Sequence, residues 1–500
     1  MGLIQKMTDK MRDGLRRFLQ LTPAPENVIV IDEGLDFLAN CAKNRIWYHG
    51  KSRQLSQLYS SLDGVEKTMF WAAPMTRGLE IRKLHTGLAK IVIDMLTAIV
   101  SNDFNGMEIT AENRRLAAEW EEIAKANEWE DKLETCLADV CTVGDGAFKL
   151  SYDRELSDKV IIEWFPAERV QFMRRRGHIR GVKFYTDYYR NGKRFQFVEV
   201  YTYGSVSYKL LNDSGGEAPL DALEETAWAK GESLAFDKRV MFAVPVVLGR
   251  HPQYRGRGAA LLDDKDDAGD ALDEVFSQWM DALRAGRTKQ MIPDRLVPRD
   301  PETGEYISPN PFDNRFIVVG DSMQEGKANG IQTDTPEIPS DSYLAAYITA
   351  LDIYLQGVIS PSTIGIDVKK LDNAEAQREK EKTTLYTRQR LVGLLSKTLP
   401  KLVAAALNAQ AMIVRGEKPV ADNLEIKAKF GEYANPSFES QVETVSKART
   451  GGVMSIRTAV DEMYGDSKDE KWKDEEERRI KEENGIAVLP ETSALDDVTV

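Results

Sequence analysis

Apolar residues recur every three or four positions over much of residues 1–140. The stretch LHTGLAKIVIDMLTAIV (84–100) shows this spacing, which predicts amphipathic helices. Gly144 and Gly146 interrupt the pattern, as glycine often does where a helix stops. The first part of the chain is therefore predicted to be mostly helical.

Residues 147–248 follow a different pattern. Short runs rich in β-branched and aromatic residues, such as KVIIEWF and FQFVEVYTY, are separated by turn residues. The sequence NGK at 191–193 predicts a two-residue hairpin turn. We expect an antiparallel sheet here, which makes the first half of the chain α+β.

Two helices are expected to flank a proline-rich insertion. Residues 259–286 and 341–359 each carry one apolar stripe, and Ser340 can cap the second helix. The insertion, residues 289–340, contains one clear strand, NRFIVVG. The stripes consist of Ala268, Leu272, Val275, Trp279 and Leu283 in the first helix and Leu344, Tyr347, Leu351, Tyr354 and Val358 in the second.

The remaining chain is predicted to be mainly helical. Helix formers run from about Ala374 to Val414, and Pro400 should kink this helix. NLEIKAKF is a predicted strand. It is followed by a helix pair broken at Gly451-Gly452, a charged helix (DSKDEKWKDEEERRIKEENG) and a loose tail.

Composition narrows the function. The chain has 500 residues and a net charge of −13, so it is poorly suited to gripping nucleic acid over a broad face. Its strongest basic cluster is RRRGHIR at 174–180, where a solvated turn and a contact with nucleic acid or an acidic partner both fit. Three irregularly spaced cysteines indicate a reducing cytoplasm. The best apolar stretch is short and contains Asp94, so no membrane span is expected.

The run DDKDDAGD at 263–270 is the most suggestive candidate for chemistry. It fails as a calcium loop because Ala268 and Val275 stand at ligand positions. A solvated acidic helix face that repels phosphate is one interpretation, and a metal-dependent nuclease or hydrolase site is the other. Since the sequence contains no phosphate-binding loop, nucleophile elbow or histidine ligand pair, we expect no enzyme activity, no metal and no cofactor.

Three stretches carry a family resemblance. They are NRIWYHGKSRQLSQLY, NEWEDKLETCLADVCTVGDGAFKLSYD and PSTIGIDVKKLDNAEAQREKEKTTLYTRQR. In this order they resemble the opening helices, the entry into the wing sheet, and the tunnel loop with the long helix of tailed-bacteriophage portal proteins. The resemblance is to the head-to-tail connectors of siphophages of Gram-positive hosts, and it covers nearly the whole chain.

The resemblance implies a ring, usually of twelve subunits, at one vertex of the capsid, through which duplex DNA is packaged and ejected. The protein would be made in the host cytoplasm and carried in the virion. Its implied partners are the terminase large subunit, the head-tail adaptor, and the major capsid and scaffolding proteins.

The resemblance also implies a portal-type α+β architecture. Its parts would be a helical and antiparallel-sheet wing (1–256), a first stem helix (257–288), a small α/β clip (289–340), a second stem helix (341–359), a tunnel loop (360–373), a long kinked helix that returns to the wing (374–440), a helical crown (441–484) and a flexible tail (485–500).

Two sets of residues would then face DNA in the channel. In the tunnel loop they are Ser362, Thr363, Asp367, Lys369, Lys370 and Asp372, with the lysine pair as a weak contact to phosphate. On the stem they are the acidic face of Asp263, Asp264, Asp266, Asp267 and Asp270. A minor capsid or scaffolding protein without a channel is a further alternative.

Overall fold

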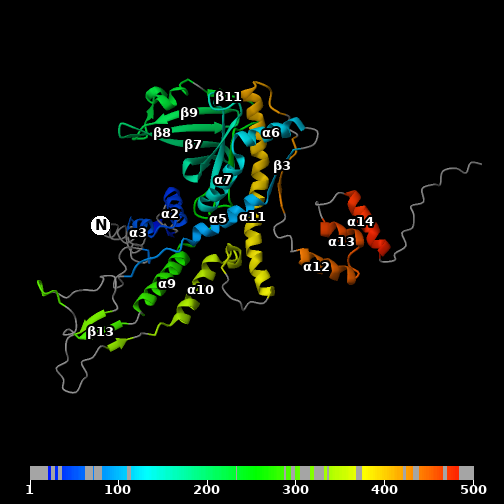
Figure 1. Cartoon of the computed structure of the whole chain (residues 1–500). Helices are drawn as coiled ribbons and strands as arrows, with labels where there is room; N and C mark the ends of the chain where they lie inside the picture. The colour runs from blue at the N-terminus through cyan, green and yellow to red at the C-terminus, as the bar shows by residue number, and fades with distance from the viewer. Residues whose placement is uncertain are drawn as a thin grey trace, which may run out of the picture. The chain divides into compact units, whose positions relative to one another are not determined.

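The computed structural model describes residues 21–23, 29–31, 36–61, 71–72, 81–109, 114–231, 233–286, 289–293, 299–304, 316–319, 332–334, 337–366, 374–420, 424–431, 438–464 and 470–483 (Figure 1). The chain divides into two compact units, residues 1–429 and 430–500. Helices and antiparallel strands both contribute, which confirms the predicted α+β class.

Helices make up most of the described chain before Gly144, as the apolar spacing predicts. The core of this part is α5, whose Val92, Leu96 and Val100 are fully buried and which packs on α7 and on the later helix α11 (Ala374–Ala409). The elements are β1 (Leu21–Pro23), β2 (Ile29–Ile31), α2 (Phe37–His49), α3 (Ser52–Ser61), α5 (Leu88–Asn102), β3 (Phe104–Ile109), α6 (Arg114–Ala126) and α7 (Trp129–Val143).

Gly144 ends α7 and starts the sheet region. Its φ of +90° lies in the left-handed region, and a Cβ at this position would stand 2.4 Å from the carbonyl oxygen of Gly258. A side chain here would therefore push apart two backbone segments that touch, which only glycine avoids.

Two antiparallel sheets follow. The smaller has the strand order β12-β4-β5, and the larger has the order β10-β9-β8-β7-β6, with β11 also paired to β9. Their strands are β4 (Asp145–Ser151), β5 (Ile161–Pro166), β6 (Val170–Arg175), β7 (His178–Arg190), β8 (Lys193–Thr202), β9 (Ser205–Leu211), β10 (Glu217–Ala218), β11 (Ser233–Ala235) and β12 (Ala243–Val247).

The hairpin predicted from NGK is confirmed. β7 and β8 are joined by Asn191 and Gly192, whose φ values of +52° and +73° are those of a two-residue type I′ hairpin turn. The two sheets are connected by a buried ion pair, in which Lys149 of β4 lies 2.7 Å from Glu199 of β8.

The two helices that flank the insertion are α9 (Asp266–Ala285) and α10 (Ser340–Leu355), and they pack along each other. α9 begins later than predicted. The Asp263 carboxylate accepts a hydrogen bond from the Ala260 amide at 2.6 Å, and Asp264 has a φ of +63°, so residues before 266 form turns. The prediction that Ser340 caps α10 is wrong, because Ser340 is its first helical residue and Pro339 takes the cap position.

The described part of the insertion contains a three-stranded mixed sheet. The predicted strand is confirmed as β14 (Phe316–Val319). β13 (Lys289–Pro293) pairs with it in parallel and with β15 (Gln332–Asp334) in antiparallel fashion. The sequence pattern does not predict β13 and β15.

The long helix α11 is helical through Pro400 and continues as a π-helical turn, η6 (Gln410–Val414). Residues Lys382–Val414 are long and apolar enough to cross a membrane, but half of the apolar window is buried inside the protein. α11 packs against α5, β4 and β12, which accounts for its apolar character. Beyond it, β16 (Ile426–Phe430) pairs with β3.

The second unit contains α12 (Phe438–Thr450), α13 (Ile456–Tyr464) and α14 (Glu470–Glu483). The first two are separated at Gly451-Gly452, as predicted. The rings of Tyr464 and Trp472 meet edge to face at 4.8 Å and join α13 to α14.

Candidate functional site

The first half of α9 carries a buried carboxylate that binds the backbone of another segment. Asp270 accepts hydrogen bonds from the amides of Trp71 at 2.5 Å and Ala72 at 2.9 Å. Its exposed fraction is 7%. Burial raises the pKa of the Asp270 carboxyl to about 6; the two amides act in the opposite direction, and the neighbouring Asp273 and Glu274 add to the rise.

Two further side chains of α9 extend this row. Asp273 accepts hydrogen bonds from the Thr86 amide and hydroxyl, each at 2.9 Å, and its second oxygen pairs with His85. The Ser277 hydroxyl accepts from the Leu84 amide at 2.9 Å. Since residues 270, 273 and 277 lie on one face of the helix, α9 is fastened to the chain that leads into α5.

The aspartates just before this row are also engaged. Asp266 pairs with Lys43 of α2, and Asp263 accepts a hydrogen bond from the Asn44 side chain at 2.8 Å. Burial raises the pKa of Asp266, while Lys43 lowers it. Asp264 and Asp267 are exposed.

These contacts correct the prediction of a solvated acidic face. Asp270 is buried and bonded to amides, so the prediction that it lines a channel is wrong. Asp263 and Asp266 are half-buried and satisfied by protein partners. Of the five aspartates, Asp264 and Asp267 alone keep exposed side chains.

The metal-dependent alternative gains no support from this arrangement. The engaged carboxylates of α9 point to different partners, and within the described ranges no group of three or more His, Cys, Asp or Glu side chains is placed to hold a metal ion.

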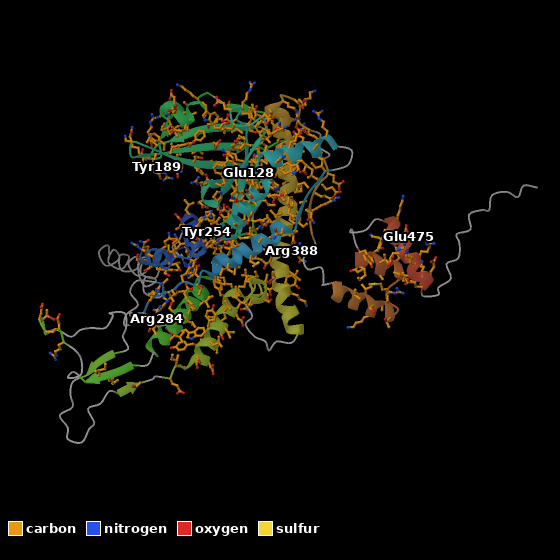
Figure 2. All side chains as sticks on the ribbon, viewed as in Figure 1. Glu128, Tyr189, Tyr254, Arg284, Arg388 and Glu475 are labelled. Carbon is orange, nitrogen blue, oxygen red and sulfur yellow. The ribbon has the colours of Figure 1, made fainter. Side chains whose placement is uncertain are left out.

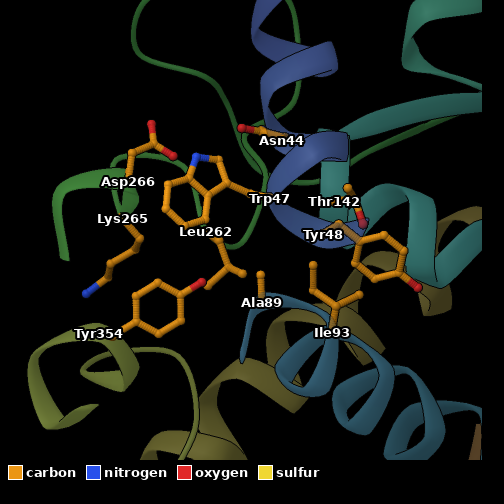
Figure 3. A pocket seen from close by; sticks show the side chains of 10 residues that line it. All are labelled: Asn44, Trp47, Tyr48, Ala89, Ile93, Thr142, Leu262, Lys265, Asp266 and Tyr354. Carbon is orange, nitrogen blue, oxygen red and sulfur yellow. The ribbon is translucent and has the colours of Figure 1, made fainter. Parts of the chain in front are cut away.

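A small pocket lies where α2, α5 and α7 meet the turn before α9 and the end of α10 (Figure 3). Trp47, Tyr354 and Lys265 are among its lining side chains. Lys265 donates to the carbonyl oxygens of Ile353 and Gln356 at 3.2 and 3.0 Å. A cation is favourable there because the last carbonyls of a helix carry partial negative charge. The pocket is therefore part of the contact region in which Lys265 holds the C-terminal end of α10.

The chain after α10 enters the predicted tunnel loop as a short 3₁₀ turn, η5 (Pro361–Ile364). Thr384 of α11, which is fully buried, accepts a hydrogen bond from the Ser360 amide at 2.9 Å, and its hydroxyl lies 2.9 Å from that of Thr363. One turn on, the Thr387 hydroxyl donates to the Val358 carbonyl at 2.6 Å. Two threonines of α11 thus hold the start of the loop.

The predicted loop residues divide into two groups. Ser362 is exposed and its hydroxyl lies 2.8 Å from that of Ser360, whereas Thr363 is half-buried against Thr384. The others lie outside the described residues: Asp367, Lys369, Lys370 and Asp372.

α11 is itself fixed one turn beyond Thr384. Arg388 is labelled on α11 in Figure 2. It donates to the carboxylate of Asp103, just after α5, at 2.6 Å and is almost fully buried. A buried arginine needs such a partner, because an unpaired charge in the interior is costly. The anchor threonines therefore stand on a helix that cannot easily rotate.

Comparison with protein families identifies the chain. A family model described as phage portal protein, SPP1 Gp6-like, matches residues 29–484. The chain belongs to this family. It is a phage portal protein. The restriction to siphophages of Gram-positive hosts stays a prediction.

Solved structures similar to this portal protein come from gene transfer agent particles. One, described as the virion of the native gene transfer agent particle, is 13% identical, with 74% of this chain and 87% of the other covered and a TM-score of 0.36. The neck of the native particle computed with C12 symmetry has 10% identity, the same coverages and a TM-score of 0.35. The neck of the empty particle computed with C6 symmetry has 13% identity, again the same coverages, and a TM-score of 0.37. No curated protein matches the chain.

The raised pKa of Asp270 predicts a pH dependence of the portal protein's stability. The folded state takes up a proton near pH 6, whereas an unfolded aspartate does so near its ordinary value of 3.8. Between these values the folded state binds more protons, so stability from this group is present at low pH and is lost as pH rises through 6.

Asp270→Asn should remove this dependence. We expect the stability of the wild-type protein relative to the variant to fall by on the order of 2 kcal/mol from about pH 4 to about pH 7. Denaturant unfolding at several pH values measures it. Asp267→Asn, at an exposed position of the same helix, is the control and should leave the difference flat. A flat difference for Asp270→Asn as well would contradict the burial argument.

The hydrogen bonds of Thr384 and Thr387 to the start of the loop lead to a second prediction. Thr384→Val removes the acceptor of the Ser360 amide, which would be left buried without a partner at a cost of about 1–3 kcal/mol. Hydrogen exchange of the amides in residues 360–365 should accelerate. Thr383→Val, the same change at the neighbouring half-exposed position, should not alter it. Equal exchange rates in both variants would show that the hydroxyl does not hold the loop.

Proposed function

We propose that α9 and α10 form the main contacts between neighbouring subunits of the portal ring. The supporting observation is that α10, whose only charged residues are Asp341 and Asp352, leaves large apolar side chains exposed on two sides. The apolar surface of a helix is normally packed against another element. In the single chain it is covered on one side.

The exposed fractions of the α10 side chains show which parts of the helix are covered in the single chain. Leu351, Tyr354 and Leu355 of α10 are buried, but Leu344 is 44% exposed and Ile353 is 52% exposed. Leu344 and Ile353 are nine residues apart, which puts them on opposite sides of a helix with about 3.6 residues per turn. One partner helix cannot cover both, and α9 itself leaves Leu283 43% exposed.

A head-to-tail ring supplies the missing cover. In such an interface one surface of each subunit meets a different surface of the next, so two sides of the same helix are buried at once.

We propose that the ring contains twelve subunits, with 257–288 and 341–359 as its stem and 289–340 as a clip that contacts the terminase large subunit and later the head-tail adaptor. Residues 1–256 with 374–440 would form the wing and 441–484 the crown. The major capsid and scaffolding proteins would meet the ring from outside.

The tunnel loop, residues 360–373, is proposed to meet DNA inside this ring. Its start is bound to α11 through Thr384 and Thr387, and Lys369 and Lys370 follow six and seven residues after Thr363, the last residue held in this way. We propose that this pair touches the phosphate backbone weakly. The exposed carboxylates of Asp264 and Asp267 would repel the duplex elsewhere and keep it from adhering.

Ile353→Glu tests the subunit contact. The side chain is half exposed, so the monomer should fold, but a charge in an apolar interface should prevent ring closure. Mass measurement in solution and electron microscopy down the ring axis give the readout. Leu156→Glu makes the same chemical change at a 76% exposed position outside the helix pair and should leave rings intact. Intact rings in both variants would exclude this face as the interface, and a compact wild-type monomer without a central hole would favour the non-channel alternative.

Lys369→Glu combined with Lys370→Glu tests the loop. We expect rings to form normally, while DNA packaging or retention falls, because the altered loop repels phosphate. Lys193→Glu with Lys209→Glu, at exposed positions of the larger sheet, is the charge-matched control. Packaging is measured as the amount of DNA per particle. Normal packaging by the loop variant would place the lysine pair away from the DNA path.

A further inference from the structure

One end of the larger sheet gathers basic side chains from two segments. Because β6 to β9 run antiparallel in sequence order, the β6–β7 turn and the β8–β9 turn lie at the same end. The loop 250–257 joins them there, since the Arg174 side chain donates to the Gly256 carbonyl at 2.7 Å. We call this surface the arginine patch; its members are Arg174, Arg175, Arg176, Arg180 and Arg255.

The arginine patch is exposed and its charge is not neutralised. All five side chains are exposed, and none of them forms an ion pair within the described residues. Carboxylates on neighbouring segments have other partners. Asp237 lies 2.8 Å from Arg239, and the buried Asp145 lies 2.8 Å from Arg257. The patch is therefore a local positive surface on a chain whose net charge is −13.

Part of the arginine patch is held in place, through the backbone at Arg176 and through side-chain contacts of Arg174 and Arg180. Arg176 and Gly177 form a two-residue turn with φ values of +50° and +81°. Arg174 also donates to the Gly177 carbonyl at 3.2 Å, and the Arg180 guanidinium lies 5.2 Å from the centre of the Tyr203 ring. Binding groups that are already ordered lose less entropy when a ligand arrives.

The chemistry of the patch selects a phosphate ligand. Guanidinium groups match phosphate oxygens in charge and in their planar arrangement of donors. A protein partner would normally add a buried apolar centre, but the exposed apolar members at this end are Met173, 37% exposed, and Tyr203, 40% exposed. We infer that the arginine patch binds the backbone of duplex DNA, at a site separate from the tunnel loop. The inference rests on the proposed function for the identity of the polyanion, since duplex DNA is the phosphate polymer that a portal meets.

Arg175→Glu combined with Arg176→Glu, in the full chain, tests the inference. The probe is a fluorescent DNA duplex of about 30 base pairs, with binding followed by anisotropy between about 50 and about 200 mM salt. We expect the Kd at low salt to rise about tenfold or more. The slope of log K against log salt should shrink by about 2, because two arginines no longer neutralise phosphates.

Arg190→Glu with Lys193→Glu is the matched control, because it makes the same change of charge beside the turn at the opposite end of the same sheet. It should bind DNA within about twofold of the wild-type protein, as specific contacts and not net charge set the affinity. The Lys369→Glu, Lys370→Glu variant should keep this binding, so a failure of the loop proposal is distinguishable from a failure of the patch proposal.

Three results would overturn the inference. One is no measurable DNA binding by the wild-type protein. Another is an equal fall in affinity for the control, which would make net charge the cause. The third is unchanged DNA affinity of the Arg175→Glu, Arg176→Glu variant; if that variant also fails to enter heads, the arginines belong to a contact with an acidic protein partner.

Discussion

The hydrogen bonds that Asp270, Asp273 and Ser277 accept fasten helix α9 to the chain that precedes α5. The amides of Trp71, Ala72, Leu84 and Thr86 belong to segments without regular structure, so the chain itself offers them no ladder of partners. A buried amide without a partner costs free energy comparable to that of a missing hydrogen bond. Helix α9 meets that need with one polar face and thereby becomes a fixed part of the subunit.

This use of the first half of α9 determines what its second half and α10 can do. The polar row and Lys265 bind inward, whereas Leu283, Leu344 and Ile353 remain exposed. The same pair of helices is therefore bonded to the rest of its own chain and still keeps apolar side chains exposed. Just after α10, the side chains of Thr384 and Thr387 bond the backbone of Ser360 and Val358 to α11. The loop that follows therefore starts from a segment that is bound to this helix.

The places of the charged side chains say more about what this protein can attract than its net charge does. Several carboxylates that contribute to the net charge of −13 are internal partners of amides or lysines, so they do not form an outer acidic field. The arginine patch shows the reverse, because its charges are exposed at one end of a sheet. Net charge alone therefore understates how strongly a small region of this protein can attract phosphate.

The sequence by itself determined the type and order of most elements. Apolar period and turn chemistry predicted the antiparallel region, the turn at Asn191-Gly192, the strand β14 and the break at Gly451-Gly452, and three stretches pointed to the portal family. These features depend on local geometry, which neighbouring residues impose on one another. The strands β13 and β15 could not be predicted from the sequence, because runs of five and three residues are too short to show a clear alternation of apolar and polar positions.

Only the tertiary structure decided what the polar residues do. The aspartates of α9 lie off its apolar stripe, and sequence spacing cannot distinguish a side chain in water from one bonded to a distant amide. Their partners stand at positions 43 to 86, and the partner of Ser360 stands in α11. Periodicity reports which face of a helix is apolar; the partner of a buried polar group is set by chain segments that folding brings together.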